Sequence, residues 1–434
     1  MPKGEGKMWR KLKNKPFIRN VFIVASGTAA AQAAALMLLP LITRLYGPEA
    51  YGLLGAFVAI TAILTPLAAL TFPTAIVLPK EDAEAVSIVR LSLKMMGLVA
   101  VLLAIVLVFF LDEFSYAFHV ESLSGYLYLL PVIVFLTGLM EVMNQWLIRT
   151  GQYKIIAKAV AYQSILSYGI MVMIGLFHPV AAVLIVVTVF RTGITAVQMY
   201  LKMKFNQEAV KINLKEASLS SAAIVKKYRD FPVYRAPEVL ISSVSYNIPV
   251  LLLTTFISPA AAGFYVLGRT ALDLPSQLIG KAVGDVFYPR IANASVLKES
   301  LVDLINKATL TLSAIGIIPF GLVIIAGPEL FTLIFGSDWL RAGEYARWIA
   351  FMSLTMFISR PAIHALPVIN AQRFQLFFTM AMTLIRFGAL YYGLVVMGDD
   401  LLAVMLFCTF SSVMYMALIV MTVVKSRNYM ILNY

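Results

Sequence analysis

The chain has 434 residues, of which 61% are hydrophobic and only 13% charged, and its mean hydropathy is +0.86. A soluble domain needs far more polar surface, so this composition excludes the soluble classes and predicts an all-α polytopic membrane protein. The net charge of +13 favours an acidic partner, such as anionic lipid headgroups or an acidic substrate, and Cys408, the single cysteine, excludes a disulfide within the chain.

Twelve stretches are long and apolar enough to cross a bilayer, because a spanning helix needs about 20 mostly apolar residues. The first stretch follows a basic N-terminus and is too long for the hydrophobic region of a cleaved signal peptide. Tight turns at Pro179 and Pro259 separate two pairs of neighbouring spans. The predicted spans are 17–44, 50–78, 86–111, 125–148, 155–177, 179–202, 231–257, 260–289, 302–326, 345–369, 373–397 and 400–424.

Lysine and arginine gather in alternate loops, whereas the loops at the other helix ends are mainly acidic. By the positive-inside rule, this pattern predicts a protein of the inner (cytoplasmic) membrane with both termini in the cytoplasm. The basic segment between the halves is typical of a solvated linker or of a helix lying on anionic lipid. The predicted regions are a basic cytoplasmic N-terminus (1–16), an N-lobe (17–203), a basic cytoplasmic linker (204–230), a C-lobe (231–425) and a cytoplasmic C-terminal tail (426–434).

The two halves of the chain resemble each other at three places that keep nearly one offset. The stretch from Pro40 to Gly52 matches that from Pro249 to Gly263. The other two pairs are 114–118 with 331–335, and 149–153 with 370–374. Because six helices per repeat is an even number, both halves enter the membrane from the same side. We therefore predict two six-helix lobes, related by a parallel pseudo-two-fold axis, with a central cavity between them.

Charged residues inside the predicted spans are the most informative feature, because each costs about 2.5–3.5 kcal/mol at a helix centre. The richest span carries a stripe at four-residue spacing, which consists of Arg269, Asp273, Gln277, Lys281 and Asp285. A stripe that faces a water-filled cavity is the favoured interpretation. The alternative is that Arg269–Asp273 and Lys281–Asp285 are self-neutralising pairs that let this helix lie in lipid.

Cations outnumber acids among these intramembrane residues, so we expect a positive cavity suited to a phosphate or pyrophosphate. Arg44 and Arg235 lie nearer the span ends, where a snorkelling role is equally compatible with the sequence. Three prolines inside spans, Pro66, Pro73 and Pro275, predict either hinges or static bends. No motif of soluble-enzyme catalysis, no catalytic residue and no metal or cofactor site is recognised, and the Asp399–Asp400 pair alone is a poor metal site.

Three segments of the chain carry a family resemblance. The first runs from Asn20 through Pro40 and Arg44 to Gly47-Pro48 and Tyr51-Gly52. The second combines Gly263-Phe264-Tyr265 and Arg269 with Leu274-Pro275 and residues 287–292. The third is 335–339 with Ala342. In these segments the chain resembles the polysaccharide (O-antigen type) flippases of the multidrug/oligosaccharidyl-lipid/polysaccharide exporter superfamily.

This resemblance implies two six-helix bundles around a cationic cavity, and a protein that is not an enzyme. A polyprenyl-pyrophosphate-linked glycan would enter from the cytoplasmic side and leave outside by alternating access. Proton or sodium coupling is compatible with the resemblance, and no residue identifies the ion. Membrane lipid and polysaccharide-assembly proteins are the other expected partners, and nucleic acid is not expected. The implied pyrophosphate ligands are Arg44, Arg269 and Lys281, followed by Arg235, Arg360 and Arg386.

Two alternatives stay open from the sequence. A multidrug cation exporter of the same superfamily would need a buried acid in the N-lobe, where Glu141 is the only deeply placed one. A membrane-embedded polysaccharide polymerase or ligase usually has a sizeable outside loop, and the longest one predicted here is the short stretch 327–344. The sequence therefore favours the flippase.

Overall fold

A computed structural model describes residues 16–117, 123–205, 212 and 217–433, and in this part of the chain helices are the only regular structure. Apolar stretches fold as helices because hydrocarbon offers the backbone no hydrogen-bonding partners, so each segment must pair its own N–H and C=O groups. The elements are α2 (Pro16–Ala68), η1 (Phe72–Val77), α3 (Asp82–Ala117), α4 (Ser124–Leu127), α5 (Leu130–Arg149), α6 (Tyr153–Gly175), α7 (Ala181–Phe205), α8 (Ser221–Lys227), η4 (Phe231–Arg235), α9 (Ala236–Phe256), α10 (Pro259–Val296), α11 (Leu301–Phe335), η5 (Ser337–Trp339), α12 (Leu340–Ile358), α13 (Arg360–Ala365), α14 (Gln372–Tyr391), η6 (Tyr392–Val396) and α15 (Asp400–Asn433).

Within the described residues, nine helical segments are long and apolar enough to cross a membrane. Their outer faces carry exposed hydrophobic side chains, such as Phe109 of α3 and Ile325 of α11, which are 72% and 76% exposed. The other predicted spans fall on the first part of α2, on α10 and on α12 with α13. The all-helical membrane fold is confirmed, and the count of twelve stays a prediction.

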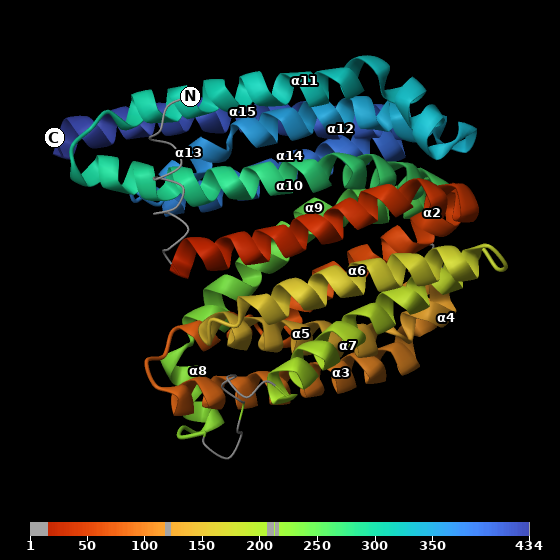
Figure 1. Ribbon diagram of the computed structural model, residues 1–434. Coiled ribbons are helices and arrows are strands. Elements are labelled where there is room, and N and C mark those ends of the chain that lie inside the picture. The colour runs from red at the N-terminus through yellow and green to blue at the C-terminus, as the bar shows by residue number, and fades with distance from the viewer. Residues whose placement is uncertain (1–15, 118–122, 206–211, 213–216, 434) are drawn as a thin grey trace, which may run out of the picture. The chain divides into compact units, whose positions relative to one another are not determined.

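The described residues group into two compact units. Unit 1 comprises the described parts of Met1–Tyr46 and Ala56–Asn247, and unit 2 comprises Gly47–Gly55 and Ile248–Tyr434. In unit 1, α5 packs against α3 and α7, and α7 also packs against α6. In unit 2, α12 packs against α10, α11 and α15, and α14 lies beside α15 (Figure 1). The predicted lobes, 17–203 and 231–425, stay a prediction.

Unit 1 contains the described part of the basic segment between the halves. Its short helix α8 places Ile224, which is fully buried, in the same hydrophobic core as α3. The Lys227 ammonium lies 2.5 Å from the Glu84 carboxylate, and the Tyr228 hydroxyl donates to the same carboxylate at 2.7 Å. Burial, followed by this hydrogen bond, raises the pKa of Tyr228 to about 12. This end of the segment is therefore packed against α3 and is not simply a solvated linker.

Two breaks in the helices occur where the sequence contains glycine and proline. Gly47 has φ 71° inside α2, a left-handed conformation that suits glycine, and it lies between the predicted spans 17–44 and 50–78. The second of these spans ends as an α-helix at Ala68. Leu70 and Thr71 then take left-handed conformations, and Pro73 lies in the first turn of η1. The sequence predicted Pro73 inside a spanning α-helix, and this prediction is wrong, because Pro73 lies in η1.

A close helix crossing in unit 2 joins the segments that carry the family resemblance. A Cβ atom on Gly52 would lie 1.7 Å from the Pro259 carbonyl oxygen, and one on Gly263 would lie 2.1 Å from that of Pro48. Small residues at both positions let the two backbones meet, as is common between membrane helices. Trp339 packs edge-on against Tyr51 and Phe264, with ring centroids 5.8 and 6.0 Å apart. This crossing fixes the start of α10, which carries Tyr265 and Arg269.

Candidate functional site: an arginine cluster in unit 2

The first part of the candidate site lies on α10. Arg269 and Asp273 are one helical turn apart, so they lie on the same face. The guanidinium carbon of Arg269 is 5.7 Å from the centroid of the Tyr265 ring, which is a cation–π distance. Asp273 is 9% exposed. The spacing predicted from the sequence is therefore present at these two positions of the stripe.

The second part is contributed by α13, a short helix that packs against α10. It begins after α12 ends at Ile358, with Pro361 in its first turn. Arg360, at its first residue, interacts electrostatically with Asp273 and with Tyr415 of α15. Its Nε atom is buried and has no hydrogen-bond partner among the described residues. A buried guanidinium N–H without a partner is costly, so this atom is suited to an incoming acceptor.

The third part is Arg386 of α14, which lies against α15. Its Nε donates to the Ser411 hydroxyl at 2.8 Å, and one Nη donates to the Tyr415 hydroxyl at 3.2 Å. The guanidinium carbon lies 5.4 Å from the ring centroids of both Phe407 and Tyr415. Phe407 in turn packs edge-on against Tyr265, so aromatic contacts connect Arg386 with Arg269.

We define the arginine cluster as Arg269, Arg360 and Arg386 together with Asp273. Arg360 interacts electrostatically with the Asp273 carboxylate, Arg269 lies against the Tyr265 ring, and Arg386 contacts rings and hydroxyls. The cluster therefore carries a positive excess in a poorly hydrated environment, where electrostatic attraction is stronger than in water. Planar guanidinium groups bind phosphate oxygens in pairs, so this arrangement suits a phosphate or pyrophosphate anion.

The other predicted site residues stand as follows. Lys281, Gln277, Asp285 and Pro275 lie on α10, and their side chains are outside the described part of the structure. Arg44 is exposed on the part of α2 that belongs to unit 1. Arg235, also in unit 1, forms a 2.9 Å ion pair with Glu238. Pro66 lies in α2 two residues before its end at Ala68.

The arrangement of the partners of Arg386 could not be read from the sequence. Ser411 and Tyr415 are one turn apart in a mainly apolar span, and this spacing is the only sequence signal that they lie on one face. Neither residue was singled out among the predicted site residues. Tyr265 was noted only as part of the family resemblance, and Phe407 had no signal, because aromatic residues are frequent along the whole chain.

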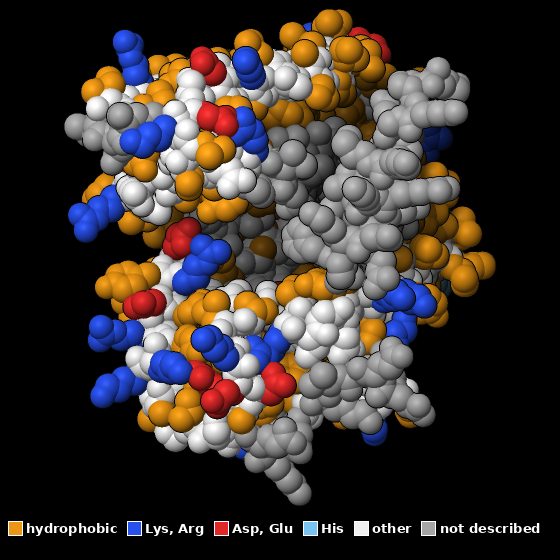
Figure 2. Space-filling model, turned by 60° about the vertical axis from the view of Figure 1, so that its left-hand side comes forward, with side chains coloured by type: hydrophobic (Ala, Val, Ile, Leu, Met, Phe, Trp, Pro, Cys, Tyr) orange, Lys and Arg blue, Asp and Glu red, His pale blue; other side chains and the backbone are white. Residues whose placement is uncertain are grey.

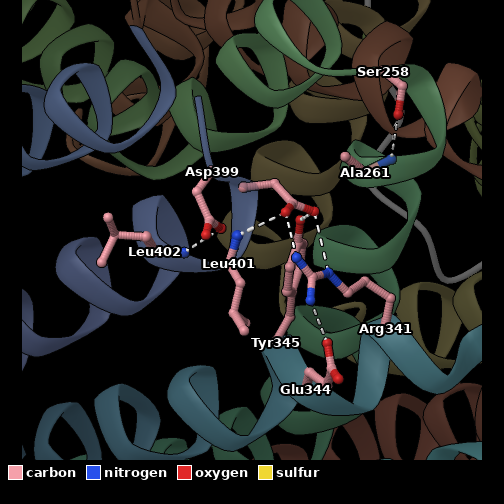
Figure 3. Close-up of polar contacts among 9 residues, drawn as sticks. Ser258, Ala261, Arg341, Glu344, Tyr345, Asp399, Leu401 and Leu402 are labelled. Carbon is pink, nitrogen blue, oxygen red and sulfur yellow. Dashed lines mark hydrogen bonds and ion pairs between the residues drawn. The ribbon is translucent and has the colours of Figure 1, made fainter. Parts of the chain in front are cut away.

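A second arginine site in unit 2 is neutralised by acids (Figure 3). Arg341, at the start of α12, donates to the Asp400 carboxylate at 2.5 and 3.3 Å and to Glu344 at 2.6 Å. The Tyr345 hydroxyl also donates to Asp400. We call this group, Arg341, Glu344, Tyr345 and Asp400, the Arg341 knot. It ties the start of α12 to the start of α15, so the Asp399–Asp400 turn has a structural partner.

A cavity of about 170 Å³ lies in unit 1 between α6 and α7, and its lining includes Gln163, Ser167, Phe190 and Arg191. The Arg191 Nε atom is buried there and has no hydrogen-bond partner among the described residues.

Across the described residues of both units, no group of three or more His, Cys, Asp or Glu side chains is placed to hold a metal ion. Figure 2 shows one face of the molecule, where Lys and Arg side chains project at several places among exposed hydrophobic ones.

The chain is similar to solved structures of membrane transporters over almost its whole length. An inward-facing multidrug resistance MATE family transporter of the MOP superfamily has a TM-score of 0.72 at 16% identity, covering 93% of this chain and 98% of its own. Lipid II flippase MurJ in an inward closed conformation has a TM-score of 0.71 at 12% identity, covering 94% and 91%. A MOP superfamily transporter from Pyrococcus furiosus has a TM-score of 0.65 at 13% identity, covering 96% and 97%.

These likenesses show the fold, so the chain is a multi-pass membrane protein with the fold of MOP superfamily transporters. Residues 41–344 match the model of the family described as polysaccharide biosynthesis protein, and this match covers more than half of the chain. The chain therefore belongs to the polysaccharide biosynthesis protein family, which confirms the resemblance drawn from its sequence. No curated protein sequence matches the chain.

Proposed function

We propose that the chain is a flippase for a lipid-pyrophosphate-linked oligosaccharide. It carries this substrate from the cytoplasmic to the outer leaflet by alternating access, for the synthesis of a surface polysaccharide. The observation that carries the proposal is the arginine cluster, whose positive excess suits the pyrophosphate that joins lipid to glycan. Membership of the polysaccharide biosynthesis protein family supports the class of cargo.

The residues of the arginine cluster take different roles in this proposal. The buried Nε–H of Arg360 has no hydrogen-bond partner among the described residues, so this arginine gains most from an incoming phosphate oxygen. Arg269 and Arg386 rest against aromatic rings, which orient their guanidinium planes toward a bound anion. Asp273 interacts with Arg360 in the absence of cargo, and this contact offsets part of the cost of its burial. Arg44, Lys281 and Arg235 remain proposed ligands, and a proton or sodium ion remains the proposed coupling ion.

The second candidate function is export of cationic drugs, because a multidrug resistance transporter is among the similar structures. A cationic drug would be repelled by an arginine cluster that holds one acid. The deeply placed acid of unit 1, Glu141, accepts a hydrogen bond from Gln145 at 2.7 Å, which ties it to its own helix α5. The charges of the described residues therefore favour an anionic cargo over a cationic one.

The test is a comparison of Arg269→Ala, Arg269→Lys and Asp273→Asn in cells that display the polysaccharide. Arg269→Ala is expected to abolish display, and Arg269→Lys to retain part of it, because lysine keeps the charge and loses the paired donors. Asp273→Asn is expected to be milder, since it leaves the positive field in place. Surface glycan is measured together with membrane abundance, so that misfolded variants are excluded.

Arg373→Ala is the matched control, because Arg373 is an exposed arginine at the start of α14, outside the cluster. Its surface glycan should equal that of the unmodified chain. A drug exporter gives the reverse order, with Asp273 and Glu141 indispensable and the arginines dispensable. Full glycan display by a well-folded Arg269→Ala variant would rule out the role of Arg269 in binding the anion.

A further inference from the structure

A separate cavity in unit 2 lies beside a kink in α11. It has a volume of about 440 Å³, and its lining comprises Ile324 of α11, Glu344, Arg347, Trp348 and Phe351 of α12, and Leu401 of α15. Four of these six residues are apolar, and Arg347 is the only cation among them. None of them belongs to the arginine cluster, so this cavity is not explained by the proposed function.

The kink fixes the position of Arg347. Pro328 has no N–H, so the carbonyl of Ile324 four residues earlier loses its helical donor, and the backbone departs from helical values at Ala326. The Arg347 Nε atom donates to that carbonyl oxygen at 2.8 Å and replaces the missing N–H. A Cβ on Gly327 would lie 2.8 Å from the Arg347 Cγ, so glycine at this position leaves room for the arginine stem. The guanidinium group is thus oriented before any ligand arrives.

The charge of Arg347 is left without an acidic partner. Glu344 is the nearest acid in the lining, and its carboxylate is taken by Arg341 at 2.6 Å (Figure 3). Among the described residues, no acidic side chain forms an ion pair with Arg347, and its side chain is exposed. The two terminal nitrogens of a guanidinium oriented through Nε form a fork that matches two oxygens of one phosphate.

The surroundings of the cavity select an amphiphile over a soluble anion. Leu322 and Ile325, beside Ile324 on the candidate span α11, are 57% and 76% exposed hydrophobic side chains. Arg347 is seven residues from the start of α12, about 10 Å along the helix axis, and Trp348 follows it in the sequence. Arginine and tryptophan are residues that commonly meet lipid headgroups.

We propose that this cavity binds one anionic phospholipid. The phosphate group binds the terminal nitrogens of Arg347, and an acyl chain lies along Trp348, Phe351 and Leu401. The bound lipid fills the space between the kink of α11 and the starts of α12 and α15. This site is independent of the glycan cargo and of the arginine cluster.

The test measures lipid binding to the purified, delipidated full-length chain by native mass spectrometry. Phosphatidylglycerol is titrated against the unmodified chain, Arg347→Gln and Arg373→Gln. One tightly bound phosphatidylglycerol is expected, with an affinity about tenfold lower in Arg347→Gln, which corresponds to about 1.4 kcal/mol. Arg373→Gln is expected to bind as the unmodified chain does, because Arg373 is exposed and lies outside the cavity.

A second variant keeps the test valid if Arg347→Gln disturbs the kink. Leu401→Trp fills the cavity and leaves Arg347 in place, and it should also weaken phosphatidylglycerol binding. Diacylglycerol, which lacks the phosphate, should bind about tenfold more weakly than phosphatidylglycerol. Equal binding of the two lipids, or unchanged binding in both variants, would overturn the proposal. Displacement of phosphatidylglycerol by millimolar inorganic phosphate would also overturn it, since the site would then serve a soluble anion.

Discussion

Unit 2 contains two arginine groups that differ in how their charge is balanced. In the Arg341 knot, one guanidinium is bound by two carboxylates, and the Tyr345 hydroxyl also donates to Asp400. The arginine cluster contains three arginines and one acid: Arg360 interacts with Asp273, whereas the contacts described for Arg269 and Arg386 are to rings and hydroxyls. The first group joins two helix ends and contains more acids than cations, whereas the described members of the second contain more cations than acids.

This difference separates a stabilising role from a binding role. Two acids around one arginine leave no charge for a ligand, so removing a member of the Arg341 knot mainly affects folding. An uncompensated guanidinium costs stability and persists only if something else requires it. Substitutions in the two groups should therefore have opposite consequences for unfolding and for transport.

The largest expected effect is that of Arg360→Met on transport. Methionine keeps much of the side-chain volume and removes the charge together with the buried Nε–H, which has no hydrogen-bond partner in the described part of the chain. Transport should fall about 100-fold, because a charge-assisted contact to the pyrophosphate contributes about 1.5–3 kcal/mol. The free energy of unfolding should stay unchanged or rise. Glycan display and thermal unfolding of the purified protein measure the two quantities.

Arg360→Lys separates charge from shape in the same experiment, and it should retain more transport than Arg360→Met. If Arg360→Met destabilised the protein strongly, the guanidinium would be part of the fold, and the contrast with the Arg341 knot would disappear.

The next effect is that of Arg341→Ala on stability. This change leaves Asp400, whose side chain is 20% exposed, without its main partner. Breaking a buried pair costs about 3–5 kcal/mol, and partial exposure of Arg341 reduces this to about 2 kcal/mol. Thermal unfolding measures the loss, and transport per folded molecule should stay unchanged.

Adding Asp400→Ala to Arg341→Ala should restore part of the lost stability, because the unpaired carboxylate is then also removed. A double variant that is no more stable than Arg341→Ala would mean that the pair does not account for the loss.

Much of the fold followed from the sequence because hydrophobic length and turn residues act locally. The turns at His178-Pro179 and Ser258-Pro259 separate α6 from α7 and α9 from α10, as predicted. The break at Gly47 also lies between two predicted spans. The early end of α2 at Ala68 was missed, because the apolar run continues through 78 and only tertiary packing reveals the left-handed turn at Leu70 and Thr71.

The site was predicted only in part, because a sequence indicates charges and not their partners. Arg269 and Asp273 could be placed on one face from their spacing alone. The link between Arg360 and Asp273 depends on the break before α13, and the link between Arg386 and Tyr415 depends on the pairing of α14 with α15. Both are long-range contacts, so no local pattern could distinguish Arg386 from an arginine that faces lipid headgroups.

The smallest expected effect comes from replacing a tyrosine by phenylalanine, once beside the arginine cluster and once in the Arg341 knot. Tyr415→Phe keeps the ring over which Arg386 lies and removes the hydroxyl that accepts its hydrogen bond at 3.2 Å. One hydrogen bond contributes about 1 kcal/mol, and Ser411 still holds Arg386, so affinity for farnesyl pyrophosphate, a short polyprenyl pyrophosphate, should fall about three- to fivefold. Tyr345→Phe removes a hydroxyl from the Arg341 knot, so it should lower thermal stability slightly and leave this affinity unchanged. Binding to the purified protein gives the affinities. Equal losses of affinity in the two variants would show that the hydroxyl of Tyr415 acts through general packing and does not orient an arginine that binds the cargo.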